Sequence, residues 1–473
     1  MKVKTLMLLA ALAAGALMAP AAAFAQDGPS LEQVKVELDN TWIIVSAVLV
    51  LFMQAGFLFL EIGFSRGKNV GAGVAKILVN LSIATIAWWA VGYGIASAGN
   101  SFFGTSGFFF DFDAGGPDAA GMLFGMLFCA VSLAIVWGTT LERIKFSAYV
   151  IYATVFAAVI YPLVAHGVYG SGLLSEIGDR AVLDFAGSSV VHLTGAVGGL
   201  AALLLLGARR GKYGPDGKPR AIPGHSMPIV GLGVLILWVG WYGFNAGSTF
   251  STDGSVFAQV ALNTQLAAAA GVLGALAIVY IKTGSIDVGM AGNGAIAGLV
   301  GVTAPSGYVE FWAAAVIGLV AGVLVVYSVL AIEKYLDDPV GALSAHGLAG
   351  IWGTLSVGLF AYEPLAETKG IVYDVSGGLA QLGVQAIGVV AVFLLVFILS
   401  YVTFAICKAT IGLRVSAEEE LAGLDISEHG MYGYPEQFIP QPELMPASSV
   451  PHVAGTPVSP TASPGKTAAT ASS

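Results

Sequence analysis

Long apolar runs, separated by short polar or charged stretches, follow one another along most of the chain between about residues 42 and 407. A helix needs about 20 mostly apolar residues to cross the hydrocarbon core of a bilayer. Measured against that length, the runs predict eleven membrane-spanning helices, at residues 42–64, 71–97, 120–140, 146–166, 188–208, 226–246, 255–281, 288–304, 308–333, 341–361 and 376–407. The fold class expected is therefore an all-α membrane protein in a lipid bilayer.

The distribution of lysine and arginine predicts the orientation of these helices, because cytoplasmic loops carry an excess of both residues. If the chain enters from outside the cytoplasm, the cytoplasmic segments hold fourteen basic residues and the outer segments only three, Lys35, Arg180 and Lys369. An odd number of crossings puts the two ends on opposite sides. The pattern thus predicts an N-out, C-in topology.

Both ends of the chain differ from the helical region. In residues 1–25, Lys2 and Lys4 precede an apolar stretch that ends in Ala23-Phe24-Ala25, which is typical of a cleaved signal peptide. An uncleaved first membrane anchor is the alternative. Residues 26–41 would form an extracytoplasmic N-terminus, 42–407 the helical domain, and 408–434 a cytoplasmic tail. Residues 435–473 are rich in Pro, Ser and Ala, which predicts disorder.

Composition supports the membrane interpretation. The chain is 56% hydrophobic and 10% charged, against roughly 25% charged residues in ordinary soluble domains. The net charge of −9 and the lack of a basic patch argue against nucleic-acid binding. The two cysteines, Cys129 and Cys407, lie inside apolar runs, so the sequence indicates neither a disulfide framework nor a metal cluster. No cofactor is expected.

Two apolar segments carry the same acid-to-histidine spacing. In DFAGSSVVHLTGAVGGL, His192 follows Asp184 by eight residues, and in DPVGALSAHGLAGIWG, His346 follows Asp338 by eight. Each histidine lies in the fifth helix of a set of five. Because five is odd, the second set must cross the membrane in the opposite sense to the first. Such inverted repeats place the functional site near the midplane, where the halves meet.

Ionisable groups inside a membrane are costly and are functional candidates. Either histidine alone could be structural, but two at equivalent positions favour a function. Imidazole gives and takes a proton near neutral pH, so a facing pair is suited to moving a proton or a protonatable solute. Glu61 and Lys76 lie at similar depths near the inner ends of the first two helices. We expect them to form a structural ion pair rather than a proton path.

Seven ordered stretches resemble the ammonium transporter (Amt/Mep/Rh) family and extend over nearly all of the chain from about 40 to 435. They are EIGFSRGKN (61–69), LERIKF (141–146), DFAGSSVVH (184–192), GWYGFNAGS (240–248), NGAIAGLVG (293–301), DDPVGALSAHG (337–347) and the segment 412–430 with GLRV, EEE, GLD and HG. The resemblance implies an eleven-helix homotrimer of the inner membrane and not an enzyme. Each subunit would conduct ammonium or methylammonium as the neutral amine, with the proton carried separately.

The resemblance also assigns roles to single residues. His192 and His346 match the family's twin pore histidines, and Trp241 matches a pore-lining tryptophan. The outer site and gate are matched by Phe128 and Phe244, which stack to close the outer mouth, by Ser248, which hydrogen-bonds the cation, and by Asp184, the acid under that site. Tyr169 stands where the family usually has tryptophan.

The assigned residues make physical sense together. An aromatic and hydroxyl site can hold a small cation by cation–π attraction of about 1–2 kcal/mol and one hydrogen bond. A dry, phenylalanine-gated pore then rejects bare charges; ammonium can give up its proton, whereas potassium and sodium cannot. Asp184 has an alternative role, because an acid at a helix start caps orphan amides and favours the positive end of the helix.

Two other functions are considered. A non-conducting ammonium sensor usually carries a fused signalling domain, and the segment after 435 is too polar and proline-rich to fold into one. A Rh-like gas channel should lack the Ser248 hydroxyl and an aromatic ring at 169, and this chain has both. In the family, a PII-type signal protein docks at the cytoplasmic face. There the acids Glu418 to Glu420 would face the basic loop that begins at Arg209.

Overall fold

The computed structural model describes residues 29–111 and 116–438. In these residues the chain forms helices and no strand, with only isolated β-bridges. Ten helices are long and apolar enough to cross a membrane, and Val288–Thr303 is a shorter apolar helix of 16 residues. The predicted all-helical membrane class is confirmed. The expected signal peptide, residues 1–25, lies outside the described residues. Of the tail expected to be disordered, residues 435–473, the first four residues form the short helix α19 (Pro435–Phe438) and the rest lie outside the described residues.

The helices follow the order of the apolar runs. The first half contains α3 (Leu31–Phe64), η1 (Gly67–Asn69), α4 (Val70–Ala87), η2 (Trp88–Gly92), α5 (Tyr93–Ala96), α6 (Gly116–Thr140), α7 (Phe146–Val155), η4 (Phe156–Ile160), α8 (Tyr161–Tyr169), η5 (Ser188–Leu193) and α9 (Thr194–Leu206). The second half contains α10 (Met227–Trp241), η6 (Tyr242–Ala246), η7 (Asp253–Ser255), α11 (Val256–Thr283), α12 (Val288–Thr303), α13 (Phe311–Ile332), η8 (Leu343–Leu348) and α14 (Ala349–Phe360). The chain ends with α15 (Glu363–Ala366), α16 (Val375–Thr410), α17 (Ala417–Ala422), α18 (Leu424–His429) and α19 (Pro435–Phe438).

The first helix is longer than its apolar run. Helix α3 begins at Leu31 rather than at residue 42, because Ser30 and Gln33 form a capping box that satisfies amides at its start. Its first turns are exposed and mix polar with apolar residues. A search for apolar length alone does not detect such an extension, whose stability comes from the cap.

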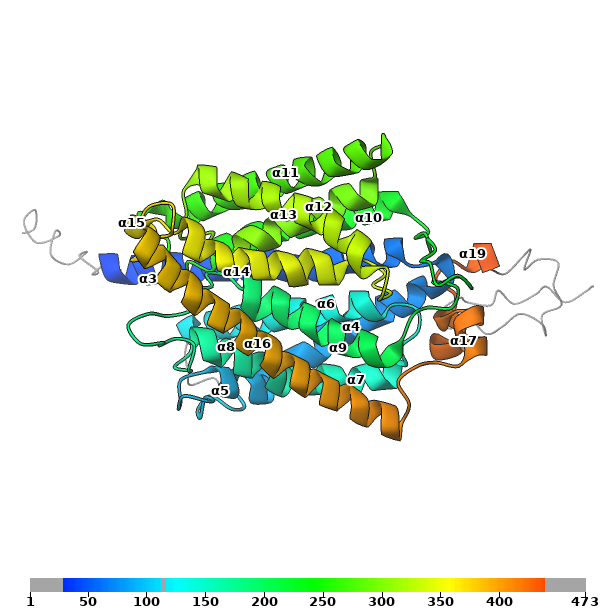
Figure 1. The fold of residues 1–473 in the computed structure, drawn as a ribbon. Coiled ribbons are helices and arrows are strands. Elements are labelled where there is room, and N and C mark those ends of the chain that lie inside the picture. The colour runs from blue at the N-terminus through cyan, green and yellow to red at the C-terminus, as the bar shows by residue number, and fades with distance from the viewer. Residues whose placement is uncertain (1–28, 112–115, 439–473) are drawn as a thin grey trace, which may run out of the picture.

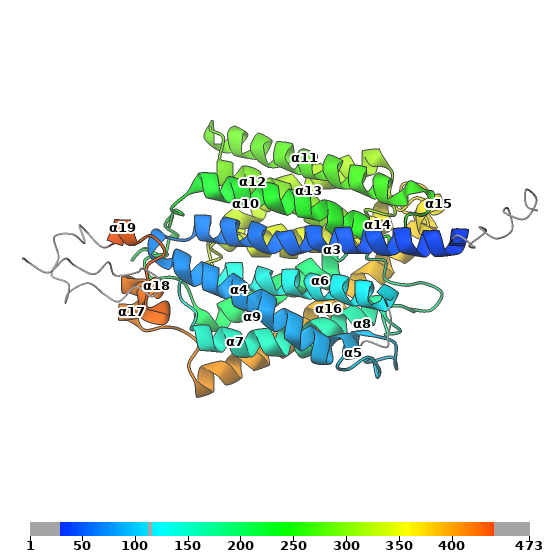
Figure 2. The ribbon, with the colours of Figure 1, turned by 180° about the vertical axis from the view of Figure 1, so that it is seen from behind.

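The long helices lie roughly side by side, and the described chain starts at one end of the bundle and finishes at the other (Figure 1). Figure 2 shows α3 across the middle of one face, with α10 to α13 on one side and α4 to α9 on the other. Equivalent pairs of helices make contact in the two halves: α3 with α6 and α10 with α12, then α6 with α9 and α12 with α14. Helix α16 crosses the bundle obliquely and packs against α9 and α14.

Glycine lets three helices of the second half touch backbone to backbone. A Cβ added at Gly298 of α12 would lie 2.3 Å from the carbonyl oxygen of Ala267 in α11. One added at Gly322 of α13 would lie 2.1 Å from the carbonyl oxygen of Gly271. In a membrane, where lipid is as apolar as leucine, such close packing is a main source of helix association. These contacts pack α11, α12 and α13 into one tight unit.

Buried charges tie the loops together at the end of the bundle where the chain finishes. The Arg209 guanidinium donates to both carboxylate oxygens of Asp337 at 2.9 Å, and Arg66 pairs with Glu142 at 2.6 Å. Burial alone would raise the pKa of the Asp337 carboxyl, but hydrogen bonds from Arg209 and the charges of Arg143 and Arg209 hold it at about 2. The cluster therefore remains ionised and paired at neutral pH.

The segment after α16 docks on this charged end. Glu420 is buried; its carboxylate pairs with Arg414 at 2.7 Å and accepts a hydrogen bond from the Arg210 amide at 2.7 Å. Asp425, also buried, accepts from the amide of Ala72 at the start of α4. The sequence predicts that Glu418 to Glu420 face the basic loop after α9. Of these three acids, Glu420 contacts that loop, at Arg210.

Candidate functional site

The acid in each acid-to-histidine repeat caps the start of a helical segment. Asp184 accepts hydrogen bonds from the amides of Gly187 (2.8 Å), Ser188 (2.8 Å), Ser189 (2.8 Å) and Val190 (3.0 Å). In the second half Asp338 accepts from the amides of Gly341 at 3.1 Å and Leu343 at 2.7 Å, three and five residues after the acid. Gly187 and Ser189 have the same offsets from Asp184. Each acid therefore caps the segment that carries its histidine.

A glycine three residues after each acid makes this cap possible. Gly187 has a φ of 113° and Gly341 a φ of 76°, both in the left-handed region that favours glycine. The chain then enters a π-helical segment, η5 with His192 or η8 with His346. Wide π turns occur often at functional sites. The repeated pattern Asp-x2-Gly-x4-His was thus a stronger signal than the spacing of acid and histidine alone.

The two histidines meet in the centre of the bundle. Their Nδ1 atoms are 3.2 Å apart, within hydrogen-bond distance, and their rings are 5.3 Å apart and inclined by 20°. Both side chains are buried. Because both partners are ring nitrogens, one must donate and the other accept. The His192 Nε2 has no hydrogen-bond partner in the described part of the chain.

Aromatic rings cover the His192 side of the pair. Phe128 and Phe244 stack face to face with centroids 4.0 Å apart, and Phe244 lies 5.4 Å from His192. Trp241 stacks on His192 at 5.0 Å and is fixed by a 2.9 Å hydrogen bond from its Nε1 to Thr303. All of these rings are buried. The column is therefore dry and apolar, and a bare cation inside it would lose its hydration without replacement.

A cavity of about 560 Å³ lies beyond the phenylalanine stack, lined by Phe128 among others. We call it the outer cavity, and the large cavity at the opposite end of the column the inner cavity, after the orientation that the sequence predicts. Tyr169 and Ser248 line the outer cavity too. The Ser248 hydroxyl donates to the carbonyl oxygen of Phe244 at 2.8 Å, which leaves its lone pairs free to accept from a cation. Six more aromatic residues, which the sequence did not single out, also line this cavity: Trp88, Tyr93, Phe124, Tyr161, Phe185 and Phe250.

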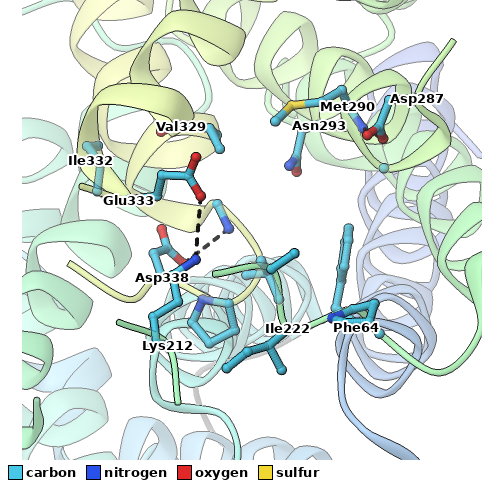
Figure 3. A pocket seen from close by; sticks show the side chains of 18 of the residues that line it. Phe64, Lys212, Ile222, Asp287, Met290, Asn293, Val329, Ile332, Glu333 and Asp338 are labelled. Atoms are coloured by element: carbon cyan, nitrogen blue, oxygen red, sulfur yellow. Dashed lines mark hydrogen bonds and ion pairs between the residues drawn. The ribbon is translucent and has the colours of Figure 1, made fainter. Parts of the chain in front are cut away.

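Two cavities lie on the His346 side. A small one of about 20 Å³ is lined by Phe57, Glu61 and His346, among others. A larger inner cavity of about 340 Å³ holds charged side chains, including Lys212 and Glu333, which pair at 3.4 Å (Figure 3). Asn293 and Val340 line both cavities. Each feature therefore contacts the next or shares a residue with it. The series begins at the outer cavity and continues through the phenylalanine stack, the histidine pair and the small cavity to the inner cavity.

Most residues singled out from the sequence come together here. His192, His346, Phe128, Phe244 and Trp241 form one column, while Tyr169 and Ser248 lie in the outer cavity.

Asp184 lies apart. It is 3% exposed, its oxygens are engaged by backbone amides, and it is not among the described residues that line the outer cavity. Its geometry is that of the helix cap considered as an alternative.

The expected ion pair between Glu61 and Lys76 is not formed. Both Glu61 carboxylate oxygens lack a hydrogen-bond partner in the described residues. The Lys76 ammonium instead lies 4.9 Å from the centre of the Trp137 ring, a cation–π contact. Similar depth along two neighbouring helices did not suffice to predict which way the side chains turn.

Comparison with known proteins gives a consistent result. A model of the Ammonium Transporter Family matches residues 41–434. The chain is 42% identical to ammonium transporter Amt2 of Archaeoglobus fulgidus, over 87% of this chain and 92% of that one. It is 33% identical to an ammonium transporter of Bacillus subtilis, over 85% and 99%.

Solved structures agree with these matches. A Sensor Amt Protein superposes with a TM-score of 0.80 and 33% identity, covering 84% of this chain and 100% of that one. Mep2 of Candida albicans superposes with a TM-score of 0.74 and 28% identity, over 91% and 98%.

Proposed function

The chain belongs to the ammonium transporter family, and from that premise we propose that it carries ammonium as ammonia plus a separately conducted proton. Transport of ammonium by a multi-pass membrane protein is the activity that the family supports, and it is not an enzymatic one. The residue roles, the topology and the assembly given below are proposals beyond that.

Recruitment would take place in the outer cavity. Its aromatic faces, Tyr169 among them, can attract a small cation, and the free lone pairs of Ser248 can accept one N–H of ammonium. Asp184 would act through the backbone: by capping η5 it holds the turn that carries His192.

Selectivity would come from the chemistry of the solute. Beyond the Phe128–Phe244 stack the column offers only rings and two neutral imidazoles, so a cation that keeps its charge meets a large desolvation cost. Ammonium avoids that cost by giving up a proton to leave neutral ammonia. Potassium and sodium have no proton to give. The hydrogen-bonded histidines provide the relay for the released proton.

The proposed topology has eleven crossings in two inverted sets of five plus α16, with the N-terminal side out and the C-terminal side in. The equivalent helix contacts of the two halves support the repeat, as do the matching acid, glycine and histidine positions. The two ends of the described chain at opposite ends of the bundle support an odd count. The short helix α12 would be the eighth crossing along the chain and brings the count to eleven. It is almost wholly buried, so neighbouring helices rather than lipid surround it.

We further propose that the protein works as a homotrimer in the inner membrane and that a PII-type protein regulates it from the cytoplasmic side. The resemblance suggests both. The docking of residues 414–425 onto the loops around Ala72 and Arg210 supports a regulatory surface, because a partner that moves this segment would also disturb the loops at the inner end of the helices.

The two alternatives differ in what the site would do. Fold similarity to a Sensor Amt Protein does not separate sensing from transport, because both use one fold. A Rh-like gas channel would not need the Ser248 hydroxyl in an aromatic cavity.

The observation that carries the proposal is the buried His192–His346 pair behind a stacked phenylalanine gate. The test is full-length protein in proteoliposomes under an inward ammonium gradient, with a matched potassium gradient as control. We expect charge movement and methylammonium uptake with ammonium ions only. Binding of ammonium without either signal would favour the sensor, and amine flux without charge movement would favour the gas channel.

A further inference from the structure

Glu61 is in an unusual position for a carboxylate. It lies near the end of α3, is 2% exposed, and neither of its oxygens has a hydrogen-bond partner in the described residues. A buried carboxylate without partners is unfavourable by several kcal/mol, so a group of this kind calls for an explanation. The cation expected to neutralise it, Lys76, points instead to the Trp137 ring.

Glu61 borders a small cavity. It lines the small cavity of about 20 Å³ together with His346. On the facing helix, α6, position 138 is glycine; a Cβ there would lie 3.7 Å from Glu61 Oε1 and 2.7 Å from Val340 Cγ2. A cavity holds a water molecule when its volume by this measure exceeds about 10–15 Å³ and polar groups surround it. This cavity therefore has room for one water between polar side chains.

The small cavity also adjoins the inner cavity. Its wall includes Asn293 of α12, which also lines the inner cavity and is labelled in Figure 3. The inner cavity is lined by Asp338, Lys212 and Glu333 and is large enough for many waters. Asn293 and Val340 line both cavities and so form a wall that the cavity beside Glu61 shares with this polar space.

We propose that Glu61 is the proton acceptor on the inner side of the histidine pair. It receives the proton from His346 through one water in the small cavity and passes it to the water of the inner cavity. This inference rests on the proposed function, since it needs a proton released from ammonium at the pair.

The transfer is balanced without any redox partner. An N–H bond of ammonium breaks, ammonia continues along the column, and the proton crosses the pair. An O–H bond then forms on Glu61 and breaks again as the inner water takes the proton. Lys76 and Tyr149 lie near enough to Glu61 to interact with it electrostatically, and His346 lines the same small cavity. The fixed positive charge of Lys76 stabilises the carboxylate between two passages.

The test compares Glu61→Gln with Glu37→Gln, which makes the same chemical change on an exposed turn of the same helix. Gln keeps the size and polarity of the side chain but cannot take a proton. We expect ammonium-evoked current to fall by about tenfold or more in Glu61→Gln, and to stay at the wild-type level in Glu37→Gln. Glu61→Asp should recover part of the current, because it restores a titratable oxygen.

A spectroscopic measurement covers the case in which Glu61→Gln folds poorly. Infrared difference spectra of the wild-type protein with and without ammonium should contain a carboxylic-acid C=O band that shifts in heavy water and moves in Glu61→Asp. An unchanged current in a well-folded Glu61→Gln, or the absence of that band, overturns the proposal. Wild-type protein without ammonium-evoked current would instead overturn the proposed function itself, so the two failures are distinguishable.

Discussion

The two halves of the molecule carry the same acid, glycine and histidine at matching offsets, yet the surroundings of the two histidines differ. His192 is covered by Trp241 and the phenylalanine stack, whereas His346 has Phe57 at 6.2 Å and a small cavity, shared with Glu61, that adjoins a charged one. The acids differ in the same direction: Asp184 is buried among amides, while Asp338 borders the inner cavity. The two halves thus place their histidines alike but surround them differently, and in the proposed pore this difference would give a selective side and an exit side.

Among substitutions that compare the two halves, the removal of one histidine should have the largest effect on transport. We expect His192→Ala to abolish proton-coupled current, a loss of at least about 100-fold, because the hydrogen-bonded pair loses one of its two ends. Charge movement evoked by ammonium in proteoliposomes measures this. His346→Ala is the matched variant and should be equally silent, since each ring needs the other. Wild-type current in either variant would rule out the relay through that ring.

Replacing the two capping acids compares the halves by stability. Asp184→Ala leaves buried amides without an acceptor and should lower the free energy of unfolding by about 3 kcal/mol. Asp338→Ala should cost about 1 kcal/mol, because water in the adjoining cavity can replace the carboxylate. Thermal unfolding in detergent micelles ranks the two variants. Equal shifts would mean that the two caps are equivalent in energy as well as in geometry.

The gate on the selective side is tested by Phe244→Ala. Loss of the ring removes the partner that stacks on Phe128 at 4.0 Å, so water should reach the pair and selectivity for ammonium over potassium should fall several-fold. Phe102→Ala, an exposed ring outside the column, is the control. Parallel current measurements with the two ions decide it, and unaltered selectivity and rate would reduce Phe244 to a packing role.

The smallest effect is expected at the outer cavity. Tyr169→Trp offers a stronger cation–π face and should lower the half-saturation concentration for ammonium by about twofold. Tyr169→Phe keeps the ring and removes only the hydroxyl. If the tryptophan variant binds no better and the phenylalanine variant binds worse, then the hydroxyl of Tyr169 matters more than its ring.

The apolar runs and the repeated histidines could be predicted because each depends on sequence alone: helix length in the first case, a repeated offset in the second. The column of Phe128, Phe244 and Trp241 followed from resemblance rather than from pattern. The early start of α3 at Leu31 could not be found by apolar length, since a cap stabilises it.

Side-chain direction was the second limit of prediction. Trp88, Tyr93 and Tyr161 lie in or beside the π-helical segments η2 and η4, and the packing of these two spans brings them to one cavity. Glu61 and Lys76 have suitable depths for a pair, but one turns to a cavity and the other to a ring. Such choices depend on the packing of neighbouring helices, which no single segment encodes.

The single hydrogen bond between the two Nδ1 atoms has a further consequence. Only one hydrogen fits between them, so the tautomer of one ring dictates that of the other. When a proton enters at the free Nε2 of His192 and another leaves from Nε2 of His346, both rings end in the opposite tautomer. They cannot pass a second proton in the same direction until they return to the starting arrangement. In the proposed relay, the pair would therefore pass one proton and then have to reset before the next, unlike a continuous water-filled path.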